Sequence, residues 1–385
     1  MNREELLLAL VRVAVCGATA SEELKNACTP EGLEEVCALA RSHDLAHLVG
    51  QAASKLALPA SRSLETCKRY AMEAMFRCTQ QTYAYTQICE VLEAEGIDFL
   101  PLKGSVLRDA YPEPWLRTSC DLDILVRGEE LERASQLLQE RLGYRYRGRS
   151  PHDLLLDSPL GVHLELHFSV MEDFISERSA ALLSGIWEYA VAAPGKKFQK
   201  ILPDPLFYYY HMAHMAKHFV NGGCGIRTVL DVWILTHRVN HDPQARDALL
   251  EQGGLLTFAR GAERLAEIWF SGASADALSG HMHRYIFDGG VYGNLQNRVS
   301  INQTREGGKL RYALSKIILP YDIMKHYYPV LQKYPLLTPV YQVVRWCRLL
   351  FCGGVRRSVR ELQVNAAVSR DQNMTAGKLL KYLEL

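Results

Sequence analysis

Residues 121–126, Asp-Leu-Asp-Ile-Leu-Val, place two acidic side chains at the start of an apolar run. This pattern is typical of a β-strand that leaves the core of a sheet at its polar end. Because alternate side chains of a strand share one face, we expect the carboxylates of Asp121 and Asp123 to lie close together and to repel each other. A hard divalent cation would relieve that repulsion, although many solvated surface turns carry the same pair.

The residues before this strand predict a site for an anion. Residues 97–102 are typical of a strand, and they are followed by Lys103-Gly104-Ser105 and a helical pattern over residues 106–110. A glycine turn that opens a helix presents backbone N–H groups and the positive end of the helix dipole. We therefore expect a triphosphate to bind here, with the Lys103 and Ser105 side chains as donors.

The residues after the strand add a third acid. Residues 162–168 alternate without a break, so the apolar side chains share one face and His163, Glu165 and His167 share the other. If this strand lies beside residues 121–126, Glu165 joins Asp121 and Asp123 over the same spot. Three acids beside a phosphate-binding turn predict a two-metal site for phosphoryl or nucleotidyl transfer.

At these residues the chain resembles the DNA polymerase beta-like nucleotidyltransferase superfamily, whose signature is a Gly-Ser turn, an Asp-x-Asp pair and a later acid. It is most similar to a bacterial nucleotidyltransferase-like group with Lys-Gly, Tyr-Pro, Arg and Glu-x-His motifs. The matching residues here are Lys103-Gly104, Tyr111-Pro112, Arg117, Glu165-x-His167, His214-x-x-Lys217-His218, Arg227 and Asp231. Many members of the superfamily have Ser directly before the first Asp, where this chain has Ser119-Cys120-Asp121.

The resemblance implies that the chain moves an NMP group from an NTP, with ATP as the expected nucleotide, to a hydroxyl of an unidentified acceptor. Two Mg²⁺ ions, or Mn²⁺ in their place, would be held by Asp121 and Asp123, and Glu165 would complete the second site. Glu165 would also orient or deprotonate the acceptor hydroxyl. For His167 we expect a hydrogen bond that orients a metal ligand.

The resemblance also assigns the phosphate-binding residues. Ser105 and the Gly104 backbone would hold the terminal phosphates, while Lys103 and Arg117 would neutralise the charge that develops as pyrophosphate leaves. Arg117 has a second interpretation, as a salt bridge that steadies the acids. The competing hypothesis for the whole chain is a nucleotide-binding, regulatory or scaffold protein that keeps the fold and does not turn over.

Composition limits the partners and the compartment. The chain has 385 residues, 44 basic and 43 acidic, so its net charge of +1 gives no general attraction to long nucleic acids or to anionic membranes. Ten cysteines without a Cys-x-x-Cys motif indicate free thiols in a reducing cytoplasm. Residues 6–20 predict an amphipathic helix and not a signal peptide. No apolar run is long enough to predict a membrane span, and the oligomeric state is open.

The expected fold class is α+β, a small mixed sheet flanked by helical lobes. We expect an N-terminal helical lobe over residues 1–95, which ends in a long helix from residue 63, then the nucleotidyltransferase core over 96–175. A C-terminal helical domain follows over 176–385, because strand signals fade after Met171. Within it, residues 271–280 and 288–308 are rich in Gly, Ser and Asn and predict loops.

Two features of the C-terminal part allow several interpretations. His211, His214 and His218 share one face of a helix that opens at Asp204-Pro205. They could bind zinc, pack as partly buried histidines, or bring His214, Lys217 or His218 to the nucleotide or the acceptor. A helix from Thr338 carries basic residues, which could form a docking surface for an acidic partner or lipid head group, or a solvated basic edge.

Overall fold

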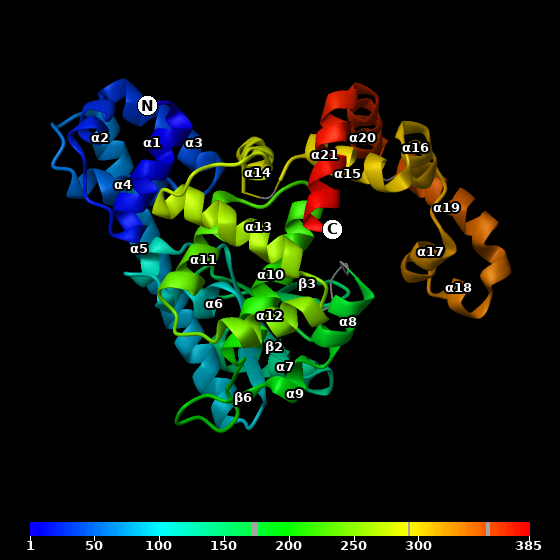
Figure 1. The fold of residues 1–385 in the computed structure, drawn as a ribbon. Coiled ribbons are helices and arrows are strands. Elements are labelled where there is room, and N and C mark those ends of the chain that lie inside the picture. The colour runs from blue at the N-terminus through cyan, green and yellow to red at the C-terminus, as the bar shows by residue number, and fades with distance from the viewer. Residues whose placement is uncertain (171–175, 292, 352–354) are drawn as a thin grey trace. The chain divides into compact units, whose positions relative to one another are not determined.

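The computed structural model describes residues 1–170, 176–291, 293–351 and 355–385 (Figure 1). The chain folds into two compact units. The first contains residues 1–217 and 225–279, and the second contains residues 218–224 and 280–385. The division into three domains at residues 95 and 175 stays a prediction. Both of its boundaries fall inside the first unit.

A five-stranded mixed sheet forms the centre of the first unit. Its spatial order is β1-β2-β5-β4-β3, in which β2 and β5 are parallel and the other neighbours are antiparallel. A small mixed sheet flanked by helices confirms the α+β fold class. The strands are β1 (Phe99–Pro101), β2 (Asp121–Val126), β3 (Arg145–Arg149), β4 (Asp153–Asp157) and β5 (His163–His167).

The pairing of β2 with β5 sets the chemistry of one sheet face. Asp123 lies directly opposite Glu165 in the register, and Asp121 lies opposite His163. A slip of one residue would turn Glu165 to the apolar face of the sheet, where Leu164 and Leu166 are fully buried. The expectation that residues 162–168 lie beside residues 121–126 is therefore confirmed.

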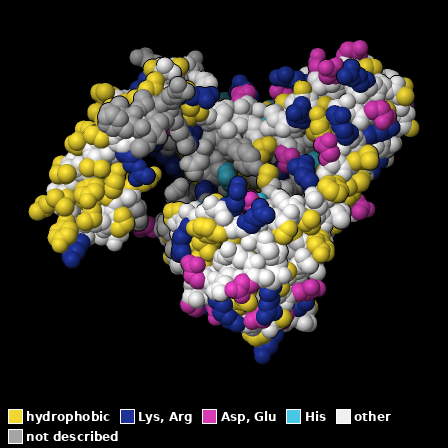
Figure 2. All heavy atoms as spheres, turned by 180° about the vertical axis from the view of Figure 1, so that it is seen from behind, with side chains coloured by type: hydrophobic (Ala, Val, Ile, Leu, Met, Phe, Trp, Pro, Cys, Tyr) yellow, Lys and Arg dark blue, Asp and Glu magenta, His cyan; other side chains and the backbone are white. Residues whose placement is uncertain are grey.

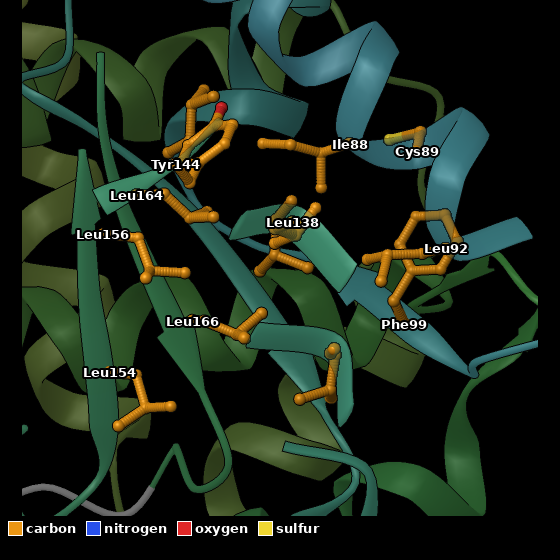
Figure 3. Packing of buried hydrophobic residues seen from close by; sticks show 14 of the residues in the cluster. Ile88, Cys89, Leu92, Phe99, Leu138, Tyr144, Leu154, Leu156, Leu164 and Leu166 are labelled. Carbon is orange, nitrogen blue, oxygen red and sulfur yellow. The ribbon is translucent and has the colours of Figure 1, made fainter. Parts of the chain in front are cut away.

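Two helices cover the apolar face of this sheet. The long α5 (Arg62–Ala94) and α7 (Leu131–Leu142) share one core cluster with the strands. Figure 3 shows Ile88 and Leu92 of α5 pointing toward Leu138 of α7 and toward the strand residues. The long helix and its end at Gly96, which has φ of +72°, follow the expectation from the apolar spacing. The core cluster of α5, α7 and the strands lies on one face of the sheet, and the polar residues lie on the opposite face.

The N-terminal helices belong to the first unit. Residues 6–16 are helical, but buried side chains lie on all sides of α1, so the expectation of an amphipathic helix over residues 6–20 is wrong. Helix α1 buries four leucines and continues into a π-helical turn over residues 12–16. Cys37 and Cys67 form a disulfide between α3 and α5, so the expectation of free thiols is wrong for this pair. The helices are α1 (Arg3–Val11), α2 (Glu22–Ala27), α3 (Pro30–Ser42) and α4 (Ala46–Lys55).

The rest of the first unit is mainly helical. A two-stranded sheet of β6 (Val191–Ala192) and β7 (Lys200–Ile201) corrects the expectation that only helices follow Met171. The strand β4 was also not predicted, because its Asp-Leu-Leu-Leu-Asp sequence does not alternate. The helices are α6 (Gly104–Leu107), α8 (Glu177–Ser184), α9 (Ile186–Tyr189), α10 (Asp204–Val220, which ends in the second unit), α11 (Ile226–His237), α12 (Pro243–Gln252) and α13 (Leu256–Ala266).

The second unit contains helices where loops were predicted over residues 288–308, and α14 also covers part of residues 271–280. Two asparagines that suggested a loop serve as a cap and a helix contact: Asn294 caps α15, and Asn297 donates to the backbone carbonyl of Tyr285 on α14. No described helix is long and apolar enough to cross a membrane. The helices are α14 (Ala277–Gly289), α15 (Leu295–Glu306), α16 (Lys309–Ile317), α17 (Tyr321–Tyr327), α18 (Val330–Lys333), α19 (Thr338–Phe351), α20 (Val355–Ala367) and α21 (Arg370–Leu383).

We predict that Leu164→Ala lowers the free energy of unfolding by about 2–5 kcal/mol, because it opens a cavity in the core that fixes the β2–β5 register. Chemical denaturation of the variant measures this loss. Leu160→Ala is the matched control, since that side chain is 52% exposed and Leu164 is fully buried. Equal losses for the two variants would contradict the position of the core.

Candidate active site

Asp123, Glu165 and His167 converge on the polar face of the sheet. One ligand atom from each of the three side chains lies within 4.8 Å of the other two. Among the described residues, this is the one group of three or more acidic, histidine or cysteine side chains with the geometry for a metal ion. The parallel pairing of β2 and β5 creates it, because Asp123 and Glu165 face each other across the two strands.

The Asp123 carboxylate is the best-compensated charge of the site. It is almost fully buried, and its Oδ1 accepts hydrogen bonds from Lys103 Nζ at 2.8 Å and from His167 Nε2 at 2.9 Å. Burial opposes ionisation, but the charges of Lys103 and His167 outweigh it and hold the pKa of Asp123 far below its usual value. Asp123 is therefore a carboxylate at any physiological pH.

His167 links Asp123 to Glu165. Its Nε2 also lies 3.3 Å from Glu165 Oε2, and the ring is only 3% exposed. Burial disfavours the charged ring, yet the two carboxylates raise the pKa of His167 above its usual value. The hydrogen bond from His167 is in turn the main reason that the pKa of Glu165 is lowered. His167 thus acts as a donor to both acids.

Asp121 lacks comparable compensation. No ion pair among the described residues includes its carboxylate, whereas Asp123 has two. Burial, followed by the charges of Asp123 and Glu165, raises the pKa of Asp121. Lys103 and His167 pair with Asp123 and Glu165, and no described side chain pairs with Asp121, so a cation near Asp121 would stabilise the site.

The predicted glycine turn connects β1 to this site. Lys103 adopts φ of +45° and ψ of −118°, a backbone conformation that costs a non-glycine residue about 1–3 kcal/mol and is concentrated at functional sites. The helix predicted over residues 106–110 is instead the short α6, followed by a 3₁₀ turn over residues 108–110. Ser105 Oγ is buried and makes no hydrogen bond with any described residue, which is uncommon for a buried hydroxyl.

The guanidinium group of Arg117 packs against Gly104 of this turn. A Cβ atom added at Gly104 would lie 2.7 Å from Arg117 Nη1, so only glycine fits above the guanidinium group. Arg117 forms a two-point ion pair with Asp231 of α11, with Nη2–Oδ2 at 3.0 Å and Nε–Oδ1 at 3.3 Å. Tyr111 donates its hydroxyl to the same carboxylate at 2.6 Å. Asp231 is fully buried, and Arg117 lowers its pKa although burial opposes this.

Arg227 and Asp231 lie four residues apart on α11, but they do not pair with each other. Arg227 Nη1 instead contacts Asp44 Oδ2 at 2.7 Å and donates to the backbone carbonyl of Thr118 at 3.0 Å. The segment before β2 is thus held by both charged residues of α11. Ser119 Oγ donates to the backbone carbonyl of Asp121 at 3.0 Å, which fixes the start of β2 across the extra residue Cys120.

Helix α10 brings further residues to the site. The burial of Lys217, followed by repulsion from Lys103, lowers the pKa of its amine to about 8. Tyr210, which the sequence did not single out, is buried. Its burial raises the pKa of its hydroxyl, Lys103 opposes this shift, and the charges of Asp123 and Glu165 add to it. His214 lies one turn further on, with its ring 6.4 Å from that of Tyr210. The helical spacing of these residues was the signal available in the sequence.

The other histidines of α10 do not join this group. His211 is buried, and its Nε2 lies 3.4 Å from the backbone carbonyl oxygen of Thr228, which fits the interpretation of a packed histidine. His218 belongs to the second unit. No zinc-type cluster of these histidines occurs in the part of the chain that the structure describes.

His152, just before β4, and Asp153, its first residue, were missed together with that strand. The His152 ring lies nearly parallel to the His167 ring, with 6.1 Å between centroids. Its Nε2 lies 3.0 Å from Asp153 Oδ2, and Asp153 is almost fully buried beside His167. His152 and Asp153 therefore back the ring that donates to Asp123 and Glu165.

A small mixed sheet with opposed acids on two parallel strands, beside a Lys-Gly-Ser turn, is the arrangement of a nucleotidyltransferase-like protein. In agreement, the family model described as uncharacterised nucleotidyltransferase matches residues 29–271, more than half of the chain. The chain belongs to this family, which confirms the resemblance found at its motifs. The match includes every site residue described above and ends before residues 280–385. No curated protein and no solved structure matches the chain.

We predict that Asp231→Asn lowers the free energy of unfolding by about 3–5 kcal/mol at pH 7, because it leaves Arg117 buried without its counter-charge. The pKa of Asp231 is lowered in the folded chain, so the ion pair stabilises at pH values above the unfolded pKa of about 3.9 and this contribution is lost as pH falls. Denaturation of both proteins at pH 7 and at about pH 2–3 measures the difference, which should shrink only as the pH falls below about 4.

Asp157→Asn is the control for this prediction. Asp157 pairs with Arg147 at 3.0 Å, but both side chains are partly exposed, so its loss should cost less than about 1 kcal/mol. A difference between wild type and Asp231→Asn that is small at pH 7, or that grows as pH falls, would show that the Arg117–Asp231 pair does not stabilise the fold.

Proposed function

We propose that this chain is a metal-dependent nucleotidyltransferase that moves an NMP group from an NTP, with ATP as the first candidate, to a hydroxyl of an acceptor. The observation that carries the proposal is the opposition of Asp123 and Glu165 across β2 and β5, next to Lys103 and its strained turn. This arrangement combines a place for hard cations with cationic and hydroxyl donors for phosphates.

The donor set fits Mg²⁺, with Mn²⁺ as an alternative. Asp121, Asp123 and Glu165 supply carboxylate oxygens, and the raised pKa of Asp121 reflects, after its burial, negative charge that the side chains leave unbalanced. These three residues would hold the cations, two in number by the resemblance to the superfamily. When bound, such ions neutralise the triphosphate and polarise the phosphorus that is attacked.

The turn residues would bind the triphosphate. Ser105 Oγ is a buried donor that no described residue uses, and a phosphate oxygen is a suitable acceptor for it. Lys103 already lies against Asp123, so its ammonium group sits where charge on the phosphates and on leaving pyrophosphate develops. Arg117 would act through Gly104, because its guanidinium group is occupied by Asp231 and lies directly below the turn.

Glu165 and its partners would prepare the acceptor. The hydrogen bond from His167 keeps Glu165 ionised, so its carboxylate can orient the acceptor hydroxyl and take its proton. His214 and Lys217 of α10 are the residues we propose for the acceptor side. A small molecule or a protein hydroxyl fits the net charge of +1 better than a long nucleic acid does. We place the reaction in the cytoplasm, where NTPs are available.

The test follows the position of a radioactive label. The chain is incubated with Mg²⁺, a lysate of its host cells and ATP labelled at either the α- or the γ-phosphate. We expect product to carry the α-label and not the γ-label. Asp123→Asn should lower the labelling rate by at least about 100-fold, because it removes a charge that the site uses in the transition state.

Asp157→Asn is the matched control, a carboxylate of the same sheet that lies outside the proposed site and should leave the rate unchanged. Transfer of the γ-label alone would replace the proposal with phosphoryl transfer. No transfer of either label with any of the four common NTPs would favour the non-catalytic nucleotide-binding protein.

A further inference from the structure

Helices α16 to α19 of the second unit expose many apolar side chains. In α16, Leu310, Leu314 and Ile317 are exposed and repeat at helical spacing, so they form one row, and the exposed Ile318 follows directly after the helix. Only Tyr312 of this helix is fully buried. A row of leucine and isoleucine on the outside of a helix is the reverse of the usual arrangement in a globular unit.

Helix α19 shows the same inversion. Val340, Val343 and Val344 are 57%, 52% and 44% exposed, whereas Gln342 on the other side of the helix is buried. Leu336, in the turn that leads into α19, is 94% exposed. The polar side chain therefore faces the unit and the apolar side chains face outward.

The C-terminal half of α19 contacts the end of α16 through the side of the helix opposite its valines. Trp346 Nε1 of α19 donates to the backbone carbonyl of Ile317 at 2.8 Å, and Arg345 Nη2 donates to that of Lys316 at 2.8 Å. Figure 2 shows hydrophobic side chains gathered over the lobe at the left edge, which contains α17 to α19. We call the exposed apolar residues of α16–α19 and the turns between them the apolar surface.

Basic residues surround the apolar surface. Residues 309–349 contain seven Lys or Arg and one Asp, while the whole chain has a net charge of only +1. Positive charge is therefore concentrated in this segment, and the rest of the chain is net negative. Arg311, Lys333 and Arg348 are exposed, and none of the ion pairs among the described residues includes them.

Tyrosine is also abundant here. Tyr327 and Tyr334 are 69% and 50% exposed, and Trp346 is 38% exposed. Aromatic side chains with a polar group favour the boundary between lipid head groups and hydrocarbon, and long basic side chains reach from apolar surroundings to the head groups. The combination of aliphatic rows, aromatic side chains and unpaired basic residues is the composition of an interfacial membrane-binding surface.

We propose that the apolar surface docks the chain on an anionic lipid bilayer. Its aliphatic rows would enter the boundary between head groups and acyl chains, and Arg311, Lys333 and Arg348 would contact lipid phosphates. A second copy of the chain is a poor occupant, because two surfaces of high positive charge repel each other. Nucleic acid is a poor occupant too, because its phosphate backbone gives aliphatic rows nothing to pack against. The segment lies outside residues 29–271 that match the family, so docking would be an addition to the family function.

The test is sedimentation of the full chain with vesicles, without nucleotide. One set of vesicles contains phosphatidylcholine alone. The other contains phosphatidylcholine and roughly one third phosphatidylglycerol, which is anionic. We expect binding to the anionic vesicles to be at least about tenfold tighter than to the neutral ones, and to weaken in high salt. Nucleotidyl transfer is not part of the assay, so its failure and the failure of the proposed function are distinguishable.

Two variants separate the contributions. Val340→Ser/Val343→Ser/Val344→Ser should weaken binding at least about tenfold by removing inserted area, and Arg311→Gln/Lys333→Gln/Arg348→Gln should do so by removing phosphate contacts. Met72→Ser/Phe76→Ser/Tyr83→Ser removes three exposed apolar side chains of α5 in the first unit and should bind like wild type. Circular dichroism shows that each variant is folded.

Three outcomes would overturn the proposal. These are equal binding to neutral and anionic vesicles, no binding to either, and unchanged binding by both variants. Light scattering gives a further check, because a dimer that the valine variant dissociates would assign the apolar surface to contact between copies of the chain.

Discussion

The site depends on the paired charge of the Asp123 carboxylate. It is buried, and it stays ionised because Lys103 and His167 both donate to one of its oxygens. Glu165, the other acid of the cluster, uses the same histidine, so the positions of β1, β2 and β5 are coupled through charge as well as through backbone pairing. Lys103 and His167 pair with two of the three acids of the site, which leaves the charge of Asp121 uncompensated. A divalent cation would compensate that charge.

The surrounding structure positions this charge cluster. Arg117 fills the space under Gly104 and is itself fixed by Asp231, so α11 supports the turn that carries Lys103. The long α5 contributes Gln81, whose amide donates to the backbone carbonyl of Ser119 just before β2. These buried contacts are specific in geometry, and their loss leaves unpaired charges or polar groups, which is why the residues around the site constrain the fold as much as the core does.

Local patterns predicted the elements of the sheet well, and the limits of that prediction have physical causes. Residues 121–126 form β2 with the predicted bounds. Their alternating start and apolar end are the pattern of a strand that passes from the edge of the core into its interior. The three-leucine run of β4 does not alternate, so it was missed, and with it His152 and Asp153. The partners of Arg117 and Arg227 could not be predicted, because contacts 114 and 183 residues apart depend on how α11 packs. Loop signals in α15 failed because Asn294 and Asn297 serve as a cap and a helix contact.

Direct measurement of bound Mn²⁺ by electron paramagnetic resonance tests the central claim that the acids of β2 and β5 share a cation. The free Mn²⁺ signal is titrated with wild type, with Asp123→Asn and with Asp157→Asn as the control. The account predicts that wild type and Asp157→Asn bind Mn²⁺ with the same affinity, and that Asp123→Asn binds at least about tenfold more weakly. Equal affinity of all three proteins, with Asp123→Asn folded, would contradict it.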